Sequence, residues 1–112
     1  MSKARTYSRY TREALALLGQ QIQVSRKQRR WSAQELATRA GVARDTVQHI
    51  EKGDAGCAIG LVFELAALVG VPLFSDDLTP ATMVRERTRV EDKLALLPKA
   101  IRPKAYEVKD DF

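Results

Sequence analysis

The sequence contains a single cysteine, Cys57, and a single histidine, His49, among its 112 residues. A disulfide framework needs paired cysteines and a Cys/His zinc site needs several such ligands, so one chain can form neither. Catalysis by either side chain would also require an acid or base partner. We therefore expect no metal, no cofactor and no enzymatic activity, and we expect Cys57 to be a small, packed or half-buried thiol.

Long apolar runs are also missing from the chain. No segment approaches the ~20 apolar residues that a membrane-spanning helix requires. The first twelve residues, MSKARTYSRYTR, lack the apolar block of a signal peptide. We expect a cytoplasmic protein without a membrane partner.

Acidic residues are scarce in the first half of the chain. Residues 1–56 hold eleven Lys and Arg against five acids, whereas residues 57–112 hold eight against nine. The net charge of +5 is therefore concentrated in the first half, where it favours attraction to phosphates, although scattered Lys and Arg can also serve solubility alone. The hydrophobic content of 45% at this length predicts one small domain with an appended piece.

Residues 31–53, WSAQELATRAGVARDTVQHIEKG, have the pattern of two short helices joined by a glycine turn. Ser32 and Glu35 have the S-x-x-E spacing of a capping box, which predicts a helix that begins at about Ala33. Gly41 supplies the backbone freedom with which that helix can end. The pattern therefore predicts a sharp turn directly after Gly41.

The second helix of this pair is expected over residues 43–52 and ends at Gly53. Val47 and Ile50 are its only large apolar residues, so they should face the core and leave a polar face outside. Such a face suits the DNA major groove, where Arg can bind guanine, Gln can bind adenine and an acid can accept from cytosine. A polar face that is merely solvated is the alternative. The residues expected to contact DNA are Ser32, Gln34, Arg39, Arg44, Asp45, Thr46, Gln48, His49 and Lys52.

Helical apolar spacing recurs outside this motif. Residues 11–29 should form an amphipathic helix, residues 59–69 a largely apolar helix that Gly70 ends, and Pro80 should open a charged helix that stops at Pro98. The fold class is therefore all-α, with five helices. Residues 71–74, VPLF, form a short extended apolar run between two of them.

The same reading divides the chain into four parts. Residues 1–10 are expected to form a flexible basic arm, residues 11–74 the DNA-binding domain, residues 75–98 a helical extension and residues 99–112 a flexible tail. A lone strand is unstable without a partner, so we expect the 71–74 run to pair with its symmetry mate in a homodimer. The residues expected to make this dimer contact are Val71, Leu73 and Phe74.

The segment from about Leu18 to Gly70 resembles the phage-repressor and Cro type of helix-turn-helix domain. The matching residues are Ser32, Glu35-Leu36-Ala37, Ala40-Gly41-Val42, Arg44-Asp45-Thr46, Ile50-Glu51-Lys52-Gly53 and Phe63-Glu64-Leu65-Ala66 through Gly70. The resemblance implies a salt bridge between Arg26 in the first helix and Glu51 at the end of the recognition helix. It also implies double-stranded DNA as the partner.

Two positions depart from the family pattern. Ala33 stands where the family usually has a glutamine that donates to a DNA phosphate, with Gln34 one place later. Ala43 stands where a capping Ser or Thr usually begins the recognition helix, and loss of such a cap costs about 1 kcal/mol of helix stability. We therefore expect modest DNA affinity.

The end of the chain resembles HipB-like antitoxins, whose genes lie beside those of HipA-type kinase toxins. The resemblance rests on the VPLF run, the charged helix after it and the LALLPKAIR segment at residues 94–102. It implies a homodimer that binds a palindromic operator in its own promoter, holds a HipA-like kinase inactive and represses more tightly with the toxin bound. A stand-alone phage-type or metabolic regulator is the alternative.

Overall fold

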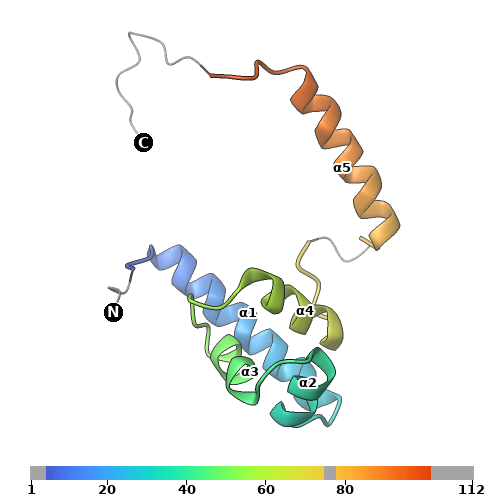
Figure 1. Ribbon diagram of the computed structural model, residues 1–112. Coiled ribbons are helices and arrows are strands. Elements are labelled where there is room, and N and C mark those ends of the chain that lie inside the picture. The colour runs from blue at the N-terminus through green and yellow to red at the C-terminus, as the bar shows by residue number, and fades with distance from the viewer. Residues whose placement is uncertain (1–4, 75–77, 102–112) are drawn as a thin grey trace. The chain divides into compact units, whose positions relative to one another are not determined.

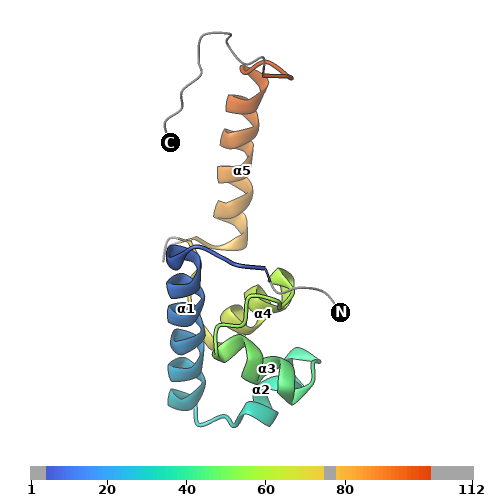
Figure 2. The ribbon, with the colours of Figure 1, turned by 90° about the vertical axis from the view of Figure 1, so that its left-hand side faces the viewer.

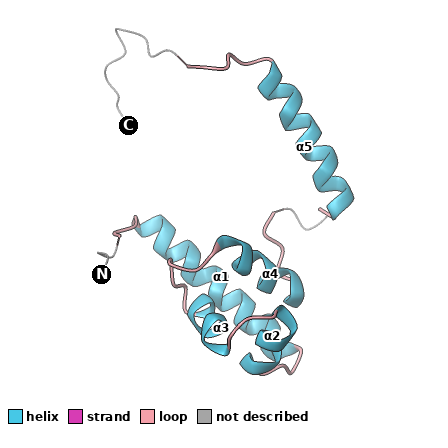
Figure 3. Cartoon of the chain, in the orientation of Figure 1, coloured by secondary structure: helices cyan, strands magenta, loops and turns pink. Residues whose placement is uncertain are grey.

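The computed structural model describes residues 5–74 and 78–101, and every regular element within them is a helix (Figures 1 and 3). The five helices are α1 (Arg9–Gln28), α2 (Ala33–Ala40), α3 (Arg44–Glu51), α4 (Ile59–Val69) and α5 (Pro80–Ala95). The predicted all-α class with five helices is confirmed. The chain divides into two units, residues 1–76 and 77–112. Most of the predicted tail and the start of the predicted arm lie outside the described residues.

The helix α1 begins two residues earlier than the apolar spacing predicted. Ser8 is its N-cap, and the Ser8 Oγ accepts from the Thr11 N–H at 3.2 Å. A cap of this kind satisfies a backbone donor of the first turn, so Arg9 and Tyr10 belong to the helix and not to the arm. At the other end, Arg30 takes a left-handed conformation with φ of 64°.

The helix α2 begins at Ala33, as predicted, because the Ser32 Oγ accepts from the Glu35 N–H at 3.0 Å. The reciprocal half of the predicted capping box is not present. The Glu35 carboxylate accepts instead from Arg39 Nε at 2.8 Å, because a charged donor one turn along the helix competes for it. Gly41 then ends α2 with φ of 71°.

Four helices, α1 to α4, surround one apolar core in the first unit. Figure 2 shows α1 along one side of this unit, with α3 and α4 beside it. The buried apolar residues come from all four helices and from Val71, which follows the Gly70 cap of α4. They are Ile22, Leu36, Ala37, Val47, Ile50, Leu65, Ala66, Val69 and Val71. Cys57 is half-buried against this core, as predicted.

Residues 71–74 form no strand among the described residues, and their expected pairing with a symmetry mate stays a prediction, because that pairing requires a second chain. The Val71 N–H donates to the Ala66 O at 2.8 Å across Gly70, which has φ of 80°. This bond folds residue 71 back onto the end of α4, as in a Schellman motif. Val71 is buried there, and the bonds that would extend this run into a strand require a second strand.

The second unit is described as the helix α5 with its flanking residues. Thr79 and Thr82 form a full capping box, and Pro80 occupies the first turn, where its missing N–H costs nothing. The helix ends at Ala95, three residues before the predicted stop at Pro98. No residue of α5 is buried.

Candidate nucleic-acid interface

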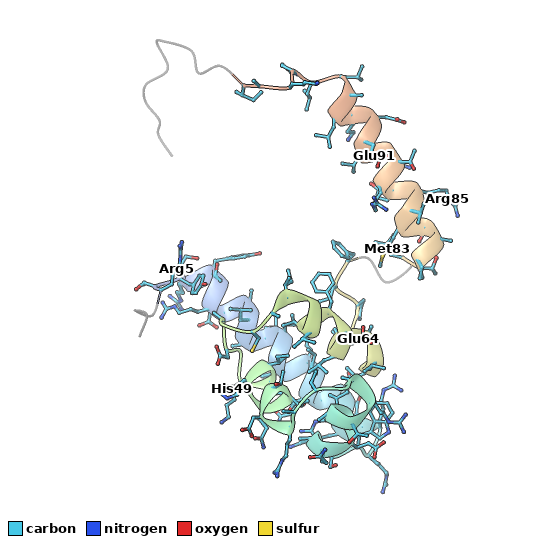
Figure 4. All side chains as sticks on the ribbon, in the orientation of Figure 1. Arg5, His49, Glu64, Met83, Arg85 and Glu91 are labelled. Atoms are coloured by element: carbon cyan, nitrogen blue, oxygen red, sulfur yellow. The ribbon has the colours of Figure 1, made fainter. Side chains whose placement is uncertain are left out.

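The helix α3 presents a polar face to solvent. Val47, Ile50 and Glu51 are buried on its inner side. Figure 4 shows the His49 side chain on the outer side of the helix. Thr46 and Gln48 are half-buried. The exposed residues on and next to α3 are Arg44, Asp45, His49 and Lys52.

A buried ion pair between Arg26 and Glu51 joins α1 to the end of α3. Arg26 Nε and Nη2 donate to the two carboxylate oxygens of Glu51, at 2.7 and 3.0 Å. Arg26 Nη1 donates to the Trp31 O at 2.9 Å, which ties in the segment that leads to α2. The side chains of Arg26 and Glu51 are only 9% and 5% exposed. The hydrogen bond to Glu51 raises the pKa of Arg26 above its ordinary value.

Two glycines let the end of α3 approach α1 closely. A Cβ at Gly19 would lie 2.5 Å from the Glu51 O and 2.6 Å from the Ile50 O. A Cβ at Gly53 would lie 2.9 Å from the Ala16 Cα, and Gly53 also has φ of 82°. Both contacts are with backbone atoms that cannot rotate away. The orientation of α3 is therefore set by backbone packing as well as by the ion pair.

This geometry of a short, rigidly held helix with an outward polar face agrees with a comparison of the sequence with known families. The model of the helix-turn-helix domain family matches residues 17–80, more than half of the chain. The chain belongs to the helix-turn-helix family. No curated protein and no solved structure matches it. In a helix-turn-helix domain the second helix of the motif, here α3, is the recognition helix, so the chain is a DNA-binding regulator by family.

A contact that the sequence reasoning missed occupies the far end of the recognition helix. Asp54 Oδ2 lies 3.0 Å from His49 Nδ1, and Asp54 Oδ1 accepts from the Gly56 N–H at 2.8 Å. The Gly56 bond first, and then the His49 bond, lower the pKa of Asp54. The D-x-G spacing of an Asx turn was the available signal. Asp54 therefore orients the His49 ring and places a negative charge beside it.

The start of α2 borders a hollow of about 170 Å³ on the α3 side. Ala33 reaches this hollow, whereas Gln34 is exposed and donates along the helix to Thr38 Oγ1 at 3.2 Å. The residues that line it are Gln23, Arg26, Ala33, Gln48, Glu51 and Lys52. An α-helix N-terminus next to a lysine is a favourable environment for an anion.

Arg39 is placed differently from the other expected contacts. Its guanidinium forms an ion pair with the Glu35 carboxylate and lies 4.1 Å from the centre of the Trp31 ring. Arg29 lies over the same ring at 5.4 Å and donates to the Val69 O at 3.2 Å. Arg39 therefore belongs to a stack of side chains between the ends of α1, α2 and α4, and contact with DNA would compete with those partners.

The three residues expected at a dimer contact lie in different environments. Val71 is buried in its own chain, Leu73 is half-buried and Phe74 is 62% exposed. The Phe74 ring meets Phe63 edge-on, with centroids 6.3 Å apart. Ile59, one helical turn before Phe63 on α4, is 71% exposed and adds a third exposed apolar side chain, on the same side of that helix as Phe63.

Among the described residues, no group of three or more His, Cys, Asp and Glu side chains is arranged to hold a metal ion. None of the described helices is both long enough and apolar enough to cross a membrane.

Proposed function

We propose that this protein is a sequence-specific transcriptional repressor that binds a palindromic operator as a homodimer. The observation that carries the proposal is the recognition helix α3, held by the Arg26–Glu51 pair with its polar face in solvent. In this proposal Arg44, at the start of α3, reads a base in the major groove, since the N-terminal residues of a recognition helix contact base edges. Asp45, Thr46, Gln48 and His49 complete the reading face.

Phosphate contacts position such a domain on DNA. We assign this role to Ser32 and Gln34 at the start of α2 and to Lys52 at the end of α3. The hollow between those two helix ends supports the assignment, because Lys52 lines it together with Ala33 at the start of α2. Lys52 thereby offers a charge where Ala33 offers no side-chain donor. Arg39 is a weaker member of this set, because leaving Trp31 and Glu35 costs it two existing contacts.

Dimerisation would place two recognition helices one DNA turn apart, ~34 Å. The exposed Phe74, with Phe63 and Ile59, supports an apolar contact between the first units of two chains. Leu73 adds to this contact. Val71 packs in the core of its own chain instead, so it supports this surface without lying on it.

We further propose that the repressor is the antitoxin of a toxin-antitoxin pair, with a HipA-like kinase as its partner. The support is the sequence resemblance at residues 94–102 and the exposure of two leucines just after α5, Leu96 and Leu97. Exposed apolar side chains at the end of a domain favour a protein partner. The protein would then be cytoplasmic and associated with the nucleoid.

A matched pair of variants tests the DNA-binding proposal. An operator is first selected from random double-stranded DNA, and binding of Arg44→Ala and Lys52→Ala is measured by fluorescence anisotropy at several salt concentrations. Arg44→Ala should lose about 1 to 3 kcal/mol on the operator and relax preference at one base pair. Lys52→Ala should weaken binding to all sequences alike and flatten the salt dependence. Equal loss on operator and random DNA for Arg44→Ala would contradict base reading.

The antitoxin proposal is tested separately. The tagged full-length protein is recovered from its native host with nuclease present, and accompanying proteins are identified by mass spectrometry. Recovery of a stoichiometric HipA-like kinase, and weaker binding of that kinase when residues 99–112 are removed, is the expected result. Recovery of a clean homodimer would favour the stand-alone regulator and leave the DNA-binding proposal untouched.

A further inference from the structure

Within the second unit, the helix α5 carries a narrow apolar stripe that the other described residues of that unit do not cover. Its members are Met83, Val90 and Leu94, which are 39%, 46% and 61% exposed. Their spacings of seven and four residues bring them to one side of a helix, and Arg87 falls between them. Figure 4 shows the side chains of α5, with Met83 and Glu91 labelled, extending away from the helix at positions all along it.

An unpartnered helix of this length is marginal in water. Isolated helices shorter than about 12 to 15 residues are marginal even with favourable sequences, and α5, with 16 residues and a β-branched, charged sequence that is not rich in alanine, is barely longer than this limit. Its weak intrahelical pairs add little, because Arg87 Nη2 and Glu91 Oε2 are 4.0 Å apart and largely exposed. A partner helix that covers the stripe would stabilise α5.

We propose that α5 pairs with α5 of a second copy of this chain, antiparallel, with Met83 opposite Leu94 and Arg87 opposite Val90. Together with Arg87, the stripe residues follow the four-three-four spacing of the core positions of a helix pair, in which each such residue packs against the facing helix. This register covers all three apolar residues of both copies. It also places the two helix starts about 25 Å apart, at opposite ends of the pair.

The charges beside the stripe select this arrangement. In the antiparallel register, Glu86 of each copy faces Lys93 of the other, and Arg87 lies next to Glu91 of the other. Four pairs of opposite charge therefore cross the interface. Sliding the antiparallel pair by one heptad toward the C-terminal end brings Lys93 against Lys93 and Glu91 against Glu91, which is unfavourable.

A parallel pair is disfavoured by the same residues. It would place Arg87 opposite Arg87 in the middle of the stripe and Glu86 beside Glu91 on both flanks. Like charges at these positions destabilise a helix pair. The charge pattern therefore favours a second copy in one orientation and one register.

Cysteine cross-linking tests the pairing in the full-length chain, with Cys57→Ala as background. Met83→Cys and Leu94→Cys variants are oxidised separately and as an equimolar mixture. We expect cross-links between chains only in the mixture, because residue 83 faces residue 94 of the other copy. Two copies of residue 83 would be about 16 Å apart, beyond the roughly 7 Å that a disulfide can span between Cα atoms. This readout stays informative if the first units also associate.

Charge reversal tests the proposed cause. Glu86→Lys should weaken the pairing about 3- to 30-fold, since two exposed pairs are lost and replaced by repulsion. The swap Glu86→Lys with Lys93→Glu should restore it. Asp92→Lys changes the charge equally on the opposite side of α5 and should have no effect. Far-UV circular dichroism checks that each variant keeps its helices.

Several outcomes would overturn the proposal. Cross-linking of Met83→Cys with itself would indicate a parallel pair, and Glu86→Lys would then strengthen association. The absence of any cross-link would show that the α5 stripes of two copies do not meet. If Glu86→Lys does not change the extent of cross-linking, the charges do not select this register. None of these outcomes bears on operator binding by α3, which is measured independently.

Discussion

The buried Arg26–Glu51 pair leads to the sharpest stability prediction for this protein. Replacement of Glu51 by alanine leaves the Arg26 side chain, 9% exposed, without the two carboxylate bonds at 2.7 and 3.0 Å. Removal of one partner of a buried pair typically costs 3 to 5 kcal/mol, about a third or more of the stability of a small domain. At roughly 4 to 8 °C per kcal/mol, the melting temperature should fall by more than about 10 °C.

The assay is urea unfolding followed by the fluorescence of Trp31, the only tryptophan. Glu35→Ala is the matched control, because Glu35 also pairs with an arginine, but at the surface, with 45% of its side chain exposed. That substitution should cost less than about 1 kcal/mol. The double variant Arg26→Met with Glu51→Leu should recover most of the loss, since apolar replacements of a buried pair are often neutral.

The effect should not depend on pH between neutrality and the unfolded pKa of Arg26. The pKa of Arg26 is raised in the folded chain by Glu51, so the contribution of Arg26 is fully present below its unfolded pKa. It is lost only as the pH rises through the still higher folded value. A cost for Glu51→Ala no larger than that for Glu35→Ala would refute the reasoning, because it would show that the pair does not hold α3 to α1.

Two glycines in helices should respond oppositely to alanine in thermal unfolding: Gly19→Ala should destabilise, because its Cβ would meet the backbone of Glu51 at 2.5 Å, whereas Gly60→Ala should stabilise by about 0.5 to 1 kcal/mol, because nothing lies within 4 Å. Arg30→Gly should stabilise by about 1 kcal/mol, since Arg30 holds a left-handed conformation that glycine adopts without strain, and no gain in urea unfolding would contradict this. Burial first, and then the charge of Asp54, raise the pKa of Cys57, so its alkylation by iodoacetamide should be slower in the folded than in the urea-unfolded protein at pH 8, and equal rates would argue against a protected thiol. The raised pKa means that the folded chain holds the Cys57 proton more tightly than the unfolded chain does. This contribution to the free energy of unfolding is fully present at neutral pH, below the unfolded pKa, and is lost as the pH rises through the folded pKa.

Local signals predicted the helices well. Ser32 begins α2, Gly41 ends it and Gly70 ends α4, because a cap depends on residues only a few positions away. The predicted bounds of α4 match the structure, whereas α1 begins earlier because the Ser8 cap was overlooked. The errors lie at helix ends, at the start of α1 and at the end of α5.

The candidate site was predicted in part. The outward face of α3 follows from the placement of Val47 and Ile50, which helical periodicity determines. The Arg26–Glu51 pair was expected only from a family resemblance, since its members are 25 residues apart. The stack of Arg39 on Trp31 was not predicted, and neither was the bond between His49 and Asp54. Such contacts depend on how helices and loops meet, which periodicity does not describe.

The sequence by itself determined the helical class, the turn at Gly41 and the division between an apolar and a polar side of each helix. These properties depend on caps, glycine conformations and residue spacing, all of which act within one or two turns of chain. Only the tertiary structure decided that Val71 closes the core of its own chain, that Glu35 bonds to Arg39, and that Gly19 lets α3 lie against α1. Each of these outcomes is a competition between alternative partners, and the partner that wins is the one that packing of the whole unit brings within reach.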